Sequence, residues 1–188
     1  MELSWFEQEF IRLMNERDKP AVLEIGTYKT TPTTTTFKHK LGGQVPGMDF
    51  IGIDCREGEN VDQVADAHRL ADVFPANHFD GVISLFTFEH LARPWVVAHQ
   101  IRHVLKPGGF VWVCTHQTYP LHYYPYDYFR FSKEAMAILF DEVDGWEMIK
   151  NEYSLPAVIM PHTNRIHGDT WNFQSESWLH VEILARKK

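Results

Sequence analysis

The sequence predicts an α/β domain with a doubly wound sheet, because strand and helix signals alternate along most of the chain. Residues 79–84 and 110–115 are too continuously apolar for strands with one face in water, which indicates a parallel sheet covered on both sides. Near the end, residues 146–153 and 177–187 predict two consecutive strands with no helix between them. We therefore expect one seven-stranded sheet whose last strand is antiparallel.

Length and composition fit one soluble globular domain over residues 1–188, with 44% apolar and 23% charged residues. The formal charge of −7 disfavours a nucleic-acid partner, which usually needs a basic face. No run of 18 apolar residues predicts a membrane span, and the acidic N-terminus has no signal-like apolar core. Cys55 and Cys114 match no metal spacing and indicate reduced thiols in the cytoplasm.

The first predicted element is an N-terminal helix within residues 1–19. Ser4 and Glu7 form a capping-box pattern, and apolar residues follow at helical spacing. Pro20 ends the helix, and residues 21–26 then predict the first strand.

A threonine-rich segment, residues 27–36, follows that strand. Its composition also fits a disordered linker, but its place between two strand signals favours a loop that leads into a helix. Thr31 as the N-cap and Pro32 in the first turn fit that start.

The remaining elements alternate in the same way. Pro94 opens one helix, and Ser132 caps another that runs to residue 143. The other predicted strands are residues 50–54, 61–66, 79–84 and 110–115. Residues 155–176 are predicted as an insertion between the last two strands, which either covers a ligand site or forms a homodimer contact. Trp171 and Phe173 fit either role.

Two segments carry a family resemblance. They read FDGVISLFTFEHL from residue 79 and VLKPGGFVWV from residue 104. Together they resemble the class I S-adenosylmethionine-dependent methyltransferases, in which an EHL-like segment follows the fourth strand and an LKPGG turn precedes the fifth. The resemblance covers about residues 20–153 and implies a Rossmann-like fold with S-adenosyl-L-methionine as cofactor.

The expected cofactor site lies at the carboxyl ends of the strands, where open α/β sheets bind ligands. Gly26 permits a sharp turn close to a ligand. Asp54 has the acceptor atoms to bind both ribose hydroxyls, although a turn aspartate is the alternative. The resemblance gives Asp66 a contact to the adenine amino group, and Leu85 offers an apolar wall. The full set of candidate cofactor residues is Glu24, Gly26, Thr27, Tyr28, Asp54, Cys55, Asp66, Ala67, Leu85 and Phe86.

The loop after the first strand departs from the family pattern G-x-G-x-G. Only Gly26 is retained, since Tyr28 and Thr30 occupy the other glycine positions. A nicotinamide-binding G-x-G-x-x-G fails at residues 28 and 31, and no phosphate-binding P-loop is present. S-adenosylmethionine has no pyrophosphate to bind, so it tolerates this loop better than a dinucleotide does.

The acceptor is expected to bind at an aromatic segment, residues 115–136. Residues 122–132 resemble a motif, H-x-x-P-x-D-Y-[WF]-R-[FW]-[ST], of methyltransferases linked to bacterial sugar and natural-product modification. Tyrosines of this segment are expected to form an acceptor pocket, and Asp127 and Arg130 are expected to pair and lock the loop. The tyrosines are Tyr123, Tyr124, Tyr126 and Tyr128.

Methyl transfer to a hydroxyl requires alignment and a base, a role that histidine suits. The candidates are His90, His116 and His122, although a single histidine is more often structural. No metal site is expected, because the spacing of His162, His167 and His180 fits neither a helix face nor a strand face.

The sequence therefore predicts a small-molecule O-methyltransferase acting on a sugar or natural-product hydroxyl. One alternative is a non-catalytic partner protein with the same fold, which the glycine-poor loop favours. Another is a protein or RNA methyltransferase, although SLFTFEHL stands where an N-P-P-Y-like tetrapeptide would mark amino-group methylation.

Overall fold

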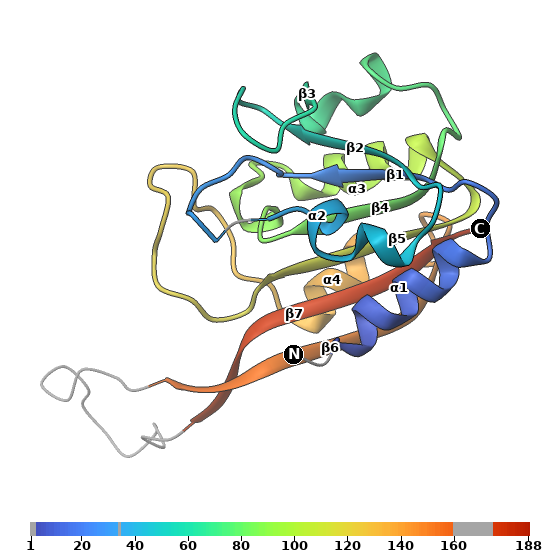
Figure 1. Ribbon diagram of the computed structural model, residues 1–188. Coiled ribbons are helices and arrows are strands. Elements are labelled where there is room, and N and C mark those ends of the chain that lie inside the picture. The colour runs from blue at the N-terminus through green and yellow to red at the C-terminus, as the bar shows by residue number, and fades with distance from the viewer. Residues whose placement is uncertain (1–2, 34, 160–174) are drawn as a thin grey trace, which may run out of the picture.

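The computed structural model describes residues 3–33, 35–159 and 175–188. Within them a mixed sheet has the order β3-β2-β1-β4-β5-β7-β6 (Figure 1). Neighbours from β3 to β5 are parallel, whereas β7 runs antiparallel to both β5 and β6. The predicted seven-stranded α/β sheet with an antiparallel last strand is confirmed.

The strands are β1 Ala21–Ile25, β2 Asp49–Asp54, β3 Gln63–Val64, β4 Phe79–Leu85, β5 Leu105–His116, β6 Trp146–Ile159 and β7 Ser175–Lys187. The helices are α1 Trp5–Asn15, α2 Phe37–Leu41, α3 Pro94–Val104 and α4 Lys133–Leu139, with short 3₁₀ turns η1 Gly42–Gln44, η2 Ala67–Asp72 and η3 Phe88–His90. No helix in these described ranges is long and apolar enough to cross a membrane.

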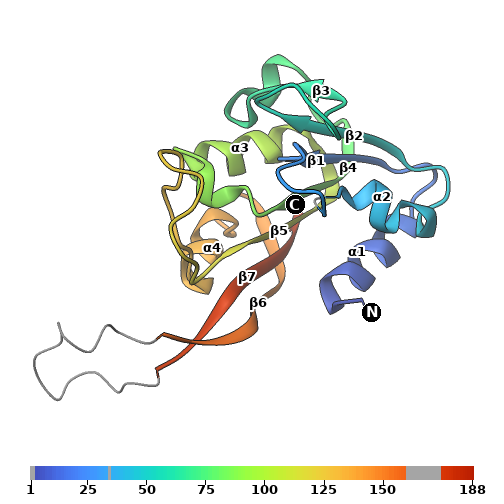
Figure 2. The same cartoon turned by 60° about the vertical axis from the view of Figure 1, so that its left-hand side comes forward.

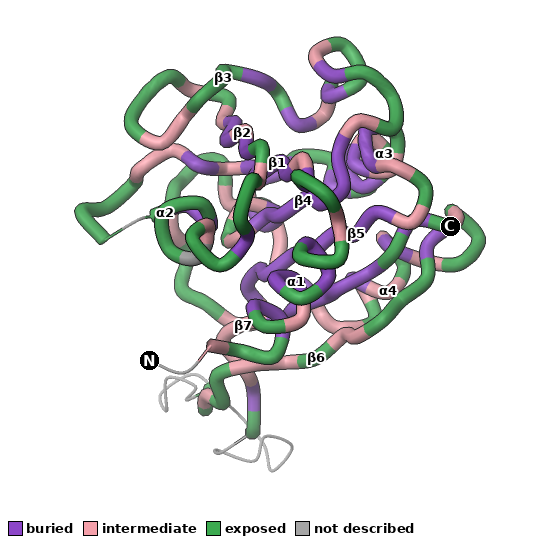
Figure 3. The backbone as a smooth tube through the Cα atoms, turned by 45° about the vertical axis from the view of Figure 1, so that its right-hand side comes forward, coloured by how far each residue is buried: buried purple, intermediate pink, exposed green. Residues whose placement is uncertain are grey.

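Helices cover both faces of the sheet (Figure 2). Helices α1 and α2 pack on one face, where Phe10, Met14 and Phe37 join one apolar cluster. Helices α3 and α4 pack on the other face, where Ile101 and Met136 belong to a second cluster. Strands β4 and β5 lie between these layers and are buried along most of their length (Figure 3), which is why their sequences are so apolar.

Local capping signals confirm three of the predicted helix starts. Ser4 and Glu7 form both hydrogen bonds of the capping box, with N···O distances of 2.8 and 3.1 Å. Pro94 is the first residue of α3, and the hydroxyl of Ser132 accepts a hydrogen bond from Ala135 N–H at the start of α4.

The predicted cap of the helix after the threonine-rich loop is wrong. Helix α2 is capped by Thr36 rather than Thr31, and Pro32 lies outside it. The reason is a long-range contact, because the carboxylate of Glu24 on β1 accepts the Phe37 N–H at 2.7 Å. The start of α2 is therefore set by the sheet as well as by local sequence.

The last two strands are longer than predicted. They pair from Trp146 opposite Lys187 out to Ile159 opposite Ser175, and their far ends extend away from the rest of the sheet (Figures 1 and 2). Residues 155–159 and 175–176 of the predicted insertion are therefore strand. Trp171, Phe173, His162 and His167 lie outside the described residues.

The carboxyl end of β7 is fixed to the rest of the sheet by a lysine. The ammonium of Lys187 donates hydrogen bonds to the carbonyl oxygen of Leu105, at 2.6 Å, and to Asn77 Oδ1, at 2.7 Å. These contacts tie β7 to the start of β5 and to the loop before β4.

Candidate cofactor and acceptor site

Four parallel strands end at one edge of the sheet. Ile25 is in register with Ile53 on β2 and with Ser84 on β4, and Leu85 is in register with Cys114 on β5. The loops that follow these strands therefore meet, as expected for a ligand site in an open α/β sheet.

Gly26 makes the sharp turn after β1. Its φ is +87°, and a Cβ at this position would lie 1.9 Å from Thr87 Oγ1. The N–H groups of Gly26 and Thr27 both donate to the carbonyl of Ile53, at 2.8 and 3.1 Å. The turn therefore requires glycine, and it places the β1 loop directly against the loop after β4.

Glu24 lies beneath this turn and is buried. Burial raises its pKa to about 8, although the hydrogen bond from Phe37 N–H opposes that rise. The side chain thus holds α2 against β1 and lies under the candidate cofactor loop.

Asp54 at the end of β2 lies at the edge, as predicted. Its carboxylate accepts the N–H of Tyr28 at 3.3 Å and that of Arg56 at 3.1 Å, and Arg56 Nε lies 3.5 Å from it. Cys55 is exposed, with its sulfur 3.6 Å from the same carboxylate. Neighbouring groups of the protein thus already provide hydrogen-bond partners for part of the Asp54 carboxylate.

Tyr28, the main departure from the glycine pattern, packs outside the turn. A Cβ on Gly58 would lie 2.4 Å from the Tyr28 ring, so the ring rests on that glycine. The Arg56 guanidinium lies 4.0 Å from the Tyr28 ring centre and 4.9 Å from that of Tyr123, and it donates to the Tyr123 hydroxyl. We call Tyr28, Arg56 and Tyr123 the arginine bridge, because they join the cofactor edge to the aromatic segment.

The other predicted cofactor residues reach the same edge. Asp66 caps η2 and accepts both the N–H and the ring N–H of His68, at 2.9 and 2.8 Å, while Ala67 is buried beside it. Leu85 is half-buried at the end of β4. Phe86 is exposed with a φ of +54°, and its ring stacks on His116 with centroids 5.2 Å apart.

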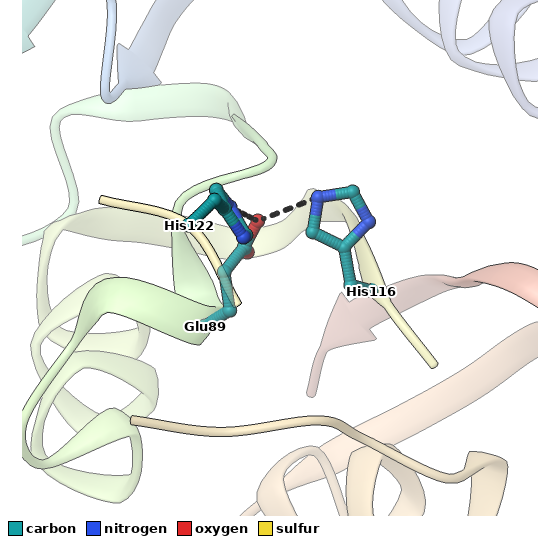
Figure 4. Close-up of side chains that lie close together, drawn as sticks. All are labelled: Glu89, His116 and His122. Atoms are coloured by element: carbon teal, nitrogen blue, oxygen red, sulfur yellow. Dashed lines mark ion pairs between the residues drawn. The ribbon is translucent and has the colours of Figure 1, made fainter. Parts of the chain in front are cut away.

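A buried carboxylate lies where the loops after β4 and β5 meet. Glu89 in η3 is fully buried and accepts a hydrogen bond from Thr115 Oγ1 at 2.7 Å through Oε2. Its other oxygen, Oε1, has no hydrogen-bond partner among the described residues. The Nε2 atoms of His116 and His122 lie 3.2 and 3.9 Å from Oε1 (Figure 4), and that of His90 also lies 3.9 Å from it.

The three predicted histidines therefore form one cluster, which we call the Glu89 cluster. They differ in environment. His116 is buried and stacks on Tyr119 at 4.1 Å, and burial, together with nearby positive groups, lowers its pKa to about 4. The side chains of His90 and His122 keep 21% and 30% of their surface exposed.

Sequence reasoning singled out the Glu89-His90 pair but gave Glu89 no role, and it missed Thr115, Tyr119 and Arg56. The signal for Glu89 was an acid directly after a buried strand end. Its burial depends on contacts with residues more than 25 positions away, which no local pattern reveals.

The predicted pairing of Asp127 with Arg130 is present. The two form a double hydrogen bond of 2.6 and 2.9 Å, and Asp127 also accepts the N–H of His122 at 2.8 Å. This pair holds the aromatic segment beside the Glu89 cluster.

The tyrosines of this segment do not form the expected closed pocket. Tyr124 is 93% exposed, and Tyr126 and Tyr128 are also exposed. The reason is that other side chains of this segment turn inward, since His116 and Phe131 are buried and Phe129 packs against the core. Only Tyr123 among the predicted tyrosines bridges to the cofactor edge.

The edge has features that fit S-adenosylmethionine. Gly26 leaves no room for a side chain at the turn, and Thr27 Oγ1 and Ser84 Oγ are buried beside it without a partner among the described residues. Asp54 and Asp66 supply carboxylates on adjoining loops. These residues match the needs of a nucleoside with a flexible charged tail.

Known structures share the fold of this chain. A protein from Archaeoglobus fulgidus described as a SAM-dependent methyltransferase superposes with a TM-score of 0.68 at 16% identity, over 96% of this chain and 90% of that one. A putative methyltransferase of Haloferax volcanii, solved with the Trm112 methyltransferase activator, gives 0.61 at 16%, over 97% and 89%. Burkholderia thailandensis 1,6-didemethyltoxoflavin-N1-methyltransferase, solved with its substrate and S-adenosylhomocysteine, gives 0.63 at 13%, over 98% and 79%. At these identities the likeness establishes the fold.

Residues 26–113 match the family model described as a methyltransferase domain. The match to this model and the fold shared with S-adenosylmethionine-dependent methyltransferases both agree with the resemblance drawn from the sequence. No protein with a curated description matches the sequence.

Proposed function

We propose that the protein transfers a methyl group from S-adenosylmethionine to a hydroxyl of a small molecule, a sugar or natural-product ring. The observation that carries the proposal is the contact between the two halves of the edge, in which Phe86 at the end of β4 stacks on His116 of the Glu89 cluster. The Burkholderia N1-methyltransferase, solved with bound 1,6-didemethyltoxoflavin, supports a small-molecule acceptor.

In this proposal Asp54 binds the ribose hydroxyls, Asp66 the adenine amino group, and the Gly26 turn leaves space for the methionine part. Thr27, Tyr28, Cys55, Ala67, Leu85 and Phe86 line the same edge. When bound, the cofactor supplies an electrophilic methyl carbon on a sulfonium, and attack by an acceptor oxygen breaks the sulfur–carbon bond with its electron pair left on sulfur.

The histidines have different roles in this proposal. His116 is a poor base at neutral pH, because burial lowers its pKa to about 4, and it is held between Phe86 and Tyr119. His122 is tied to Asp127 through its backbone. We assign the base to His90, whose Nδ1–H donates to the Tyr126 carbonyl at 2.7 Å and whose Nε2 is left to take the hydroxyl proton.

Calorimetry with S-adenosylhomocysteine tests the cofactor assignment. The matched pair is Asp54→Ala and Asp49→Ala, which change the last and the first residue of β2, the latter exposed. We expect the first to weaken binding roughly tenfold or more, since hydrogen bonds to a carboxylate contribute about 1.5–3 kcal/mol, and the second to leave it unchanged. Equal binding in both variants would contradict the assignment.

Mass spectrometry of small molecules retained by the purified protein, followed by turnover assays on them, tests the acceptor and the base. His90→Ala is expected to lower kcat with cofactor affinity unchanged, whereas His103→Ala, an exposed histidine of α3, is the control. Unaltered kcat in His90→Ala would remove the base assignment.

A second candidate function, a non-catalytic partner protein, is favoured by the arginine bridge, because Arg56 Nε already lies 3.5 Å from the carboxylate of Asp54. The Haloferax relative, solved with an activator protein, supports a protein partner. Absence of any cofactor binding at millimolar concentration would favour this function over methyl transfer. In either case we place the protein in the cytoplasm, since Cys55 and Cys114 are free thiols.

A further inference from the structure

In the Glu89 cluster, a carboxylate oxygen and three imidazole nitrogens, all of which can accept a proton or bind a cation, lie close together. Glu89 Oε1 is buried and has no hydrogen-bond partner in the described ranges, yet three imidazole nitrogens lie within 3.9 Å of it. A buried carboxylate oxygen without a donor is unfavourable, so the arrangement indicates that a positively charged ligand completes it.

Hydrogen bonds fix which nitrogen of two rings carries the proton. His90 Nδ1 lies 2.7 Å from the carbonyl oxygen of Tyr126, and His122 Nδ1 lies 3.1 Å from that of Pro120. A carbonyl only accepts, so each Nδ1 is the donor, and in the neutral ring Nε2 presents its lone pair toward Glu89.

Outer contacts of this kind are typical of metal-binding histidines, whose second nitrogen usually donates to a carbonyl or a carboxylate. His122 has both, since Asp127 Oδ2 also lies 3.4 Å from its Nδ1. His116 adds a third nitrogen, since its Nε2 lies 3.2 Å from Glu89 Oε1. A neutral imidazole is the form that binds metals.

Distances within the cluster suit a small cation. Two ligand atoms each about 2.0–2.2 Å from an ion lie roughly 3–4 Å apart, and Glu89 Oε1 lies 3.2 Å from His116 Nε2 and 3.9 Å from His122 Nε2. All three ligand atoms lie within 4.8 Å of one another, so a modest inward movement of the rings completes a coordination shell.

We propose that Glu89 Oε1, His116 Nε2 and His122 Nε2 bind a divalent transition-metal ion. Two histidines and one carboxylate favour zinc or ferrous iron over magnesium or calcium, which prefer oxygen ligands. Three protein ligands leave a coordination position open, as in catalytic metal sites.

The open position gives the ion a role that rests on the proposed methyl transfer. An acceptor hydroxyl bound to the ion ionises more readily, and its proton passes to His90 Nε2, which lies beside the cluster but outside the proposed ligand set. The acceptor class narrows accordingly to molecules whose methylated hydroxyl can coordinate a metal. From the spacing of His162, His167 and His180, the sequence predicted no metal site. Glu89, His116 and His122 were not considered together, because they are far apart in the chain.

The test uses the full chain after chelator treatment, with Zn²⁺ titrated by calorimetry and Co²⁺ followed by its visible absorption. We expect one ion per chain and a cobalt spectrum typical of nitrogen and oxygen ligands. Glu89→Gln, His116→Ala and His122→Ala should each weaken zinc binding at least about tenfold and change the cobalt spectrum. His103→Ala should do neither, and circular dichroism checks that each variant is folded.

A native protein that binds no Zn²⁺ or Co²⁺, or a cobalt spectrum that is the same in the three ligand variants, would overturn the metal site. Cofactor binding is measured separately with S-adenosylhomocysteine in the absence of metal. Loss of metal binding with the cofactor still bound would overturn this inference alone, whereas metal binding without cofactor binding would overturn the proposed function alone.

Discussion

The carboxylates on the two sides of the strand-end edge differ in how many hydrogen-bond partners they have. On the cofactor side, Asp54 and Asp66 each accept hydrogen bonds from neighbouring backbone N–H groups, and a cation or imidazole covers each. On the acceptor side, Glu89 receives one hydroxyl donor and keeps a buried oxygen without a partner among the described residues.

The carboxylates on the cofactor side already have hydrogen-bond partners, whereas Glu89 on the acceptor side has a buried oxygen that a positively charged ligand could pair with. The cofactor side must exchange existing contacts for a ligand, so the net gain on binding is small for each contact. On the acceptor side, the free-energy cost of removing water from the Glu89 oxygen is already included in folding. A ligand that pairs with this oxygen therefore gains more binding free energy there. Four substitutions test this difference between the two sides.

The largest effect is expected for Gly26→Ala. The new Cβ would meet Thr87 Oγ1 at 1.9 Å in a backbone of φ +87°, so we expect a loss of about 3 kcal/mol or more in unfolding free energy. Gly43→Ala is the matched control, because nothing lies within 4 Å of its Cβ position. Urea denaturation measures both, and equal midpoints would show that the turn is not a close contact.

On the acceptor side, Asp127→Asn is expected to cost about 2 kcal/mol, because it removes the charge from a double hydrogen bond to Arg130. The control is Asp72→Asn, which breaks another ion pair at three-residue spacing, with exposed Arg69, and should cost less than about 0.5 kcal/mol. Thermal unfolding separates the two. A similar small loss for both would mean that Asp127 does not lock the loop.

Glu24 gives a pH dependence. Burial raises its pKa to about 8 from 4.5, so between these values the folded protein holds a proton that the unfolded chain releases. The contribution is fully present below pH 4.5 and is lost as pH rises through 8, by up to about 1.4 kcal/mol per pH unit. Glu24→Gln, which keeps the acceptor for Phe37 N–H, should lack this slope in denaturation measured from pH 5 to 9. A parallel dependence in native and variant proteins would refute the prediction.

The smallest effect concerns the arginine bridge. Arg56→Ala frees the outer side of Asp54, and we expect S-adenosylhomocysteine to bind a few times more tightly, as for the loss of a competing contact of about 0.5–1 kcal/mol. Arg12→Ala on α1 is a remote control. Weaker binding in Arg56→Ala would mean that Arg56 itself contacts the cofactor.

The fold could be predicted because its signals are local. Ser4, Pro94 and Ser132 mark helix starts through contacts within three residues, and the two apolar strands at the centre reveal their burial directly. The start of α2 was missed because a side chain on β1 helps to set it. Local sequence does not contain such a contact.

Part of the site could also be predicted from local signals, because these mark the ends of the strands. Strand ends gave Gly26, Asp54 and Asp66, since the topology of the sheet brings them to one edge. The convergence of His116 and His122 on Glu89 and the contact of Arg56 with Tyr123 join residues between 27 and 67 positions apart. Those contacts depend on loop conformation, which the residue pattern leaves open.

The place of β7 in the sheet has a consequence for how the chain folds during synthesis. β7 follows β6 in sequence but lies between β5 and β6, and within the described residues β6 pairs in the sheet only with β7. As the ribosome releases the chain from its N-terminus, β1 to β5 can assemble first, while β6 has no strand to pair with until residues of β7 emerge. The edge of β5 is therefore open to other chains for that interval, until β7 pairs with it and Lys187 ties β7 to Leu105 and Asn77.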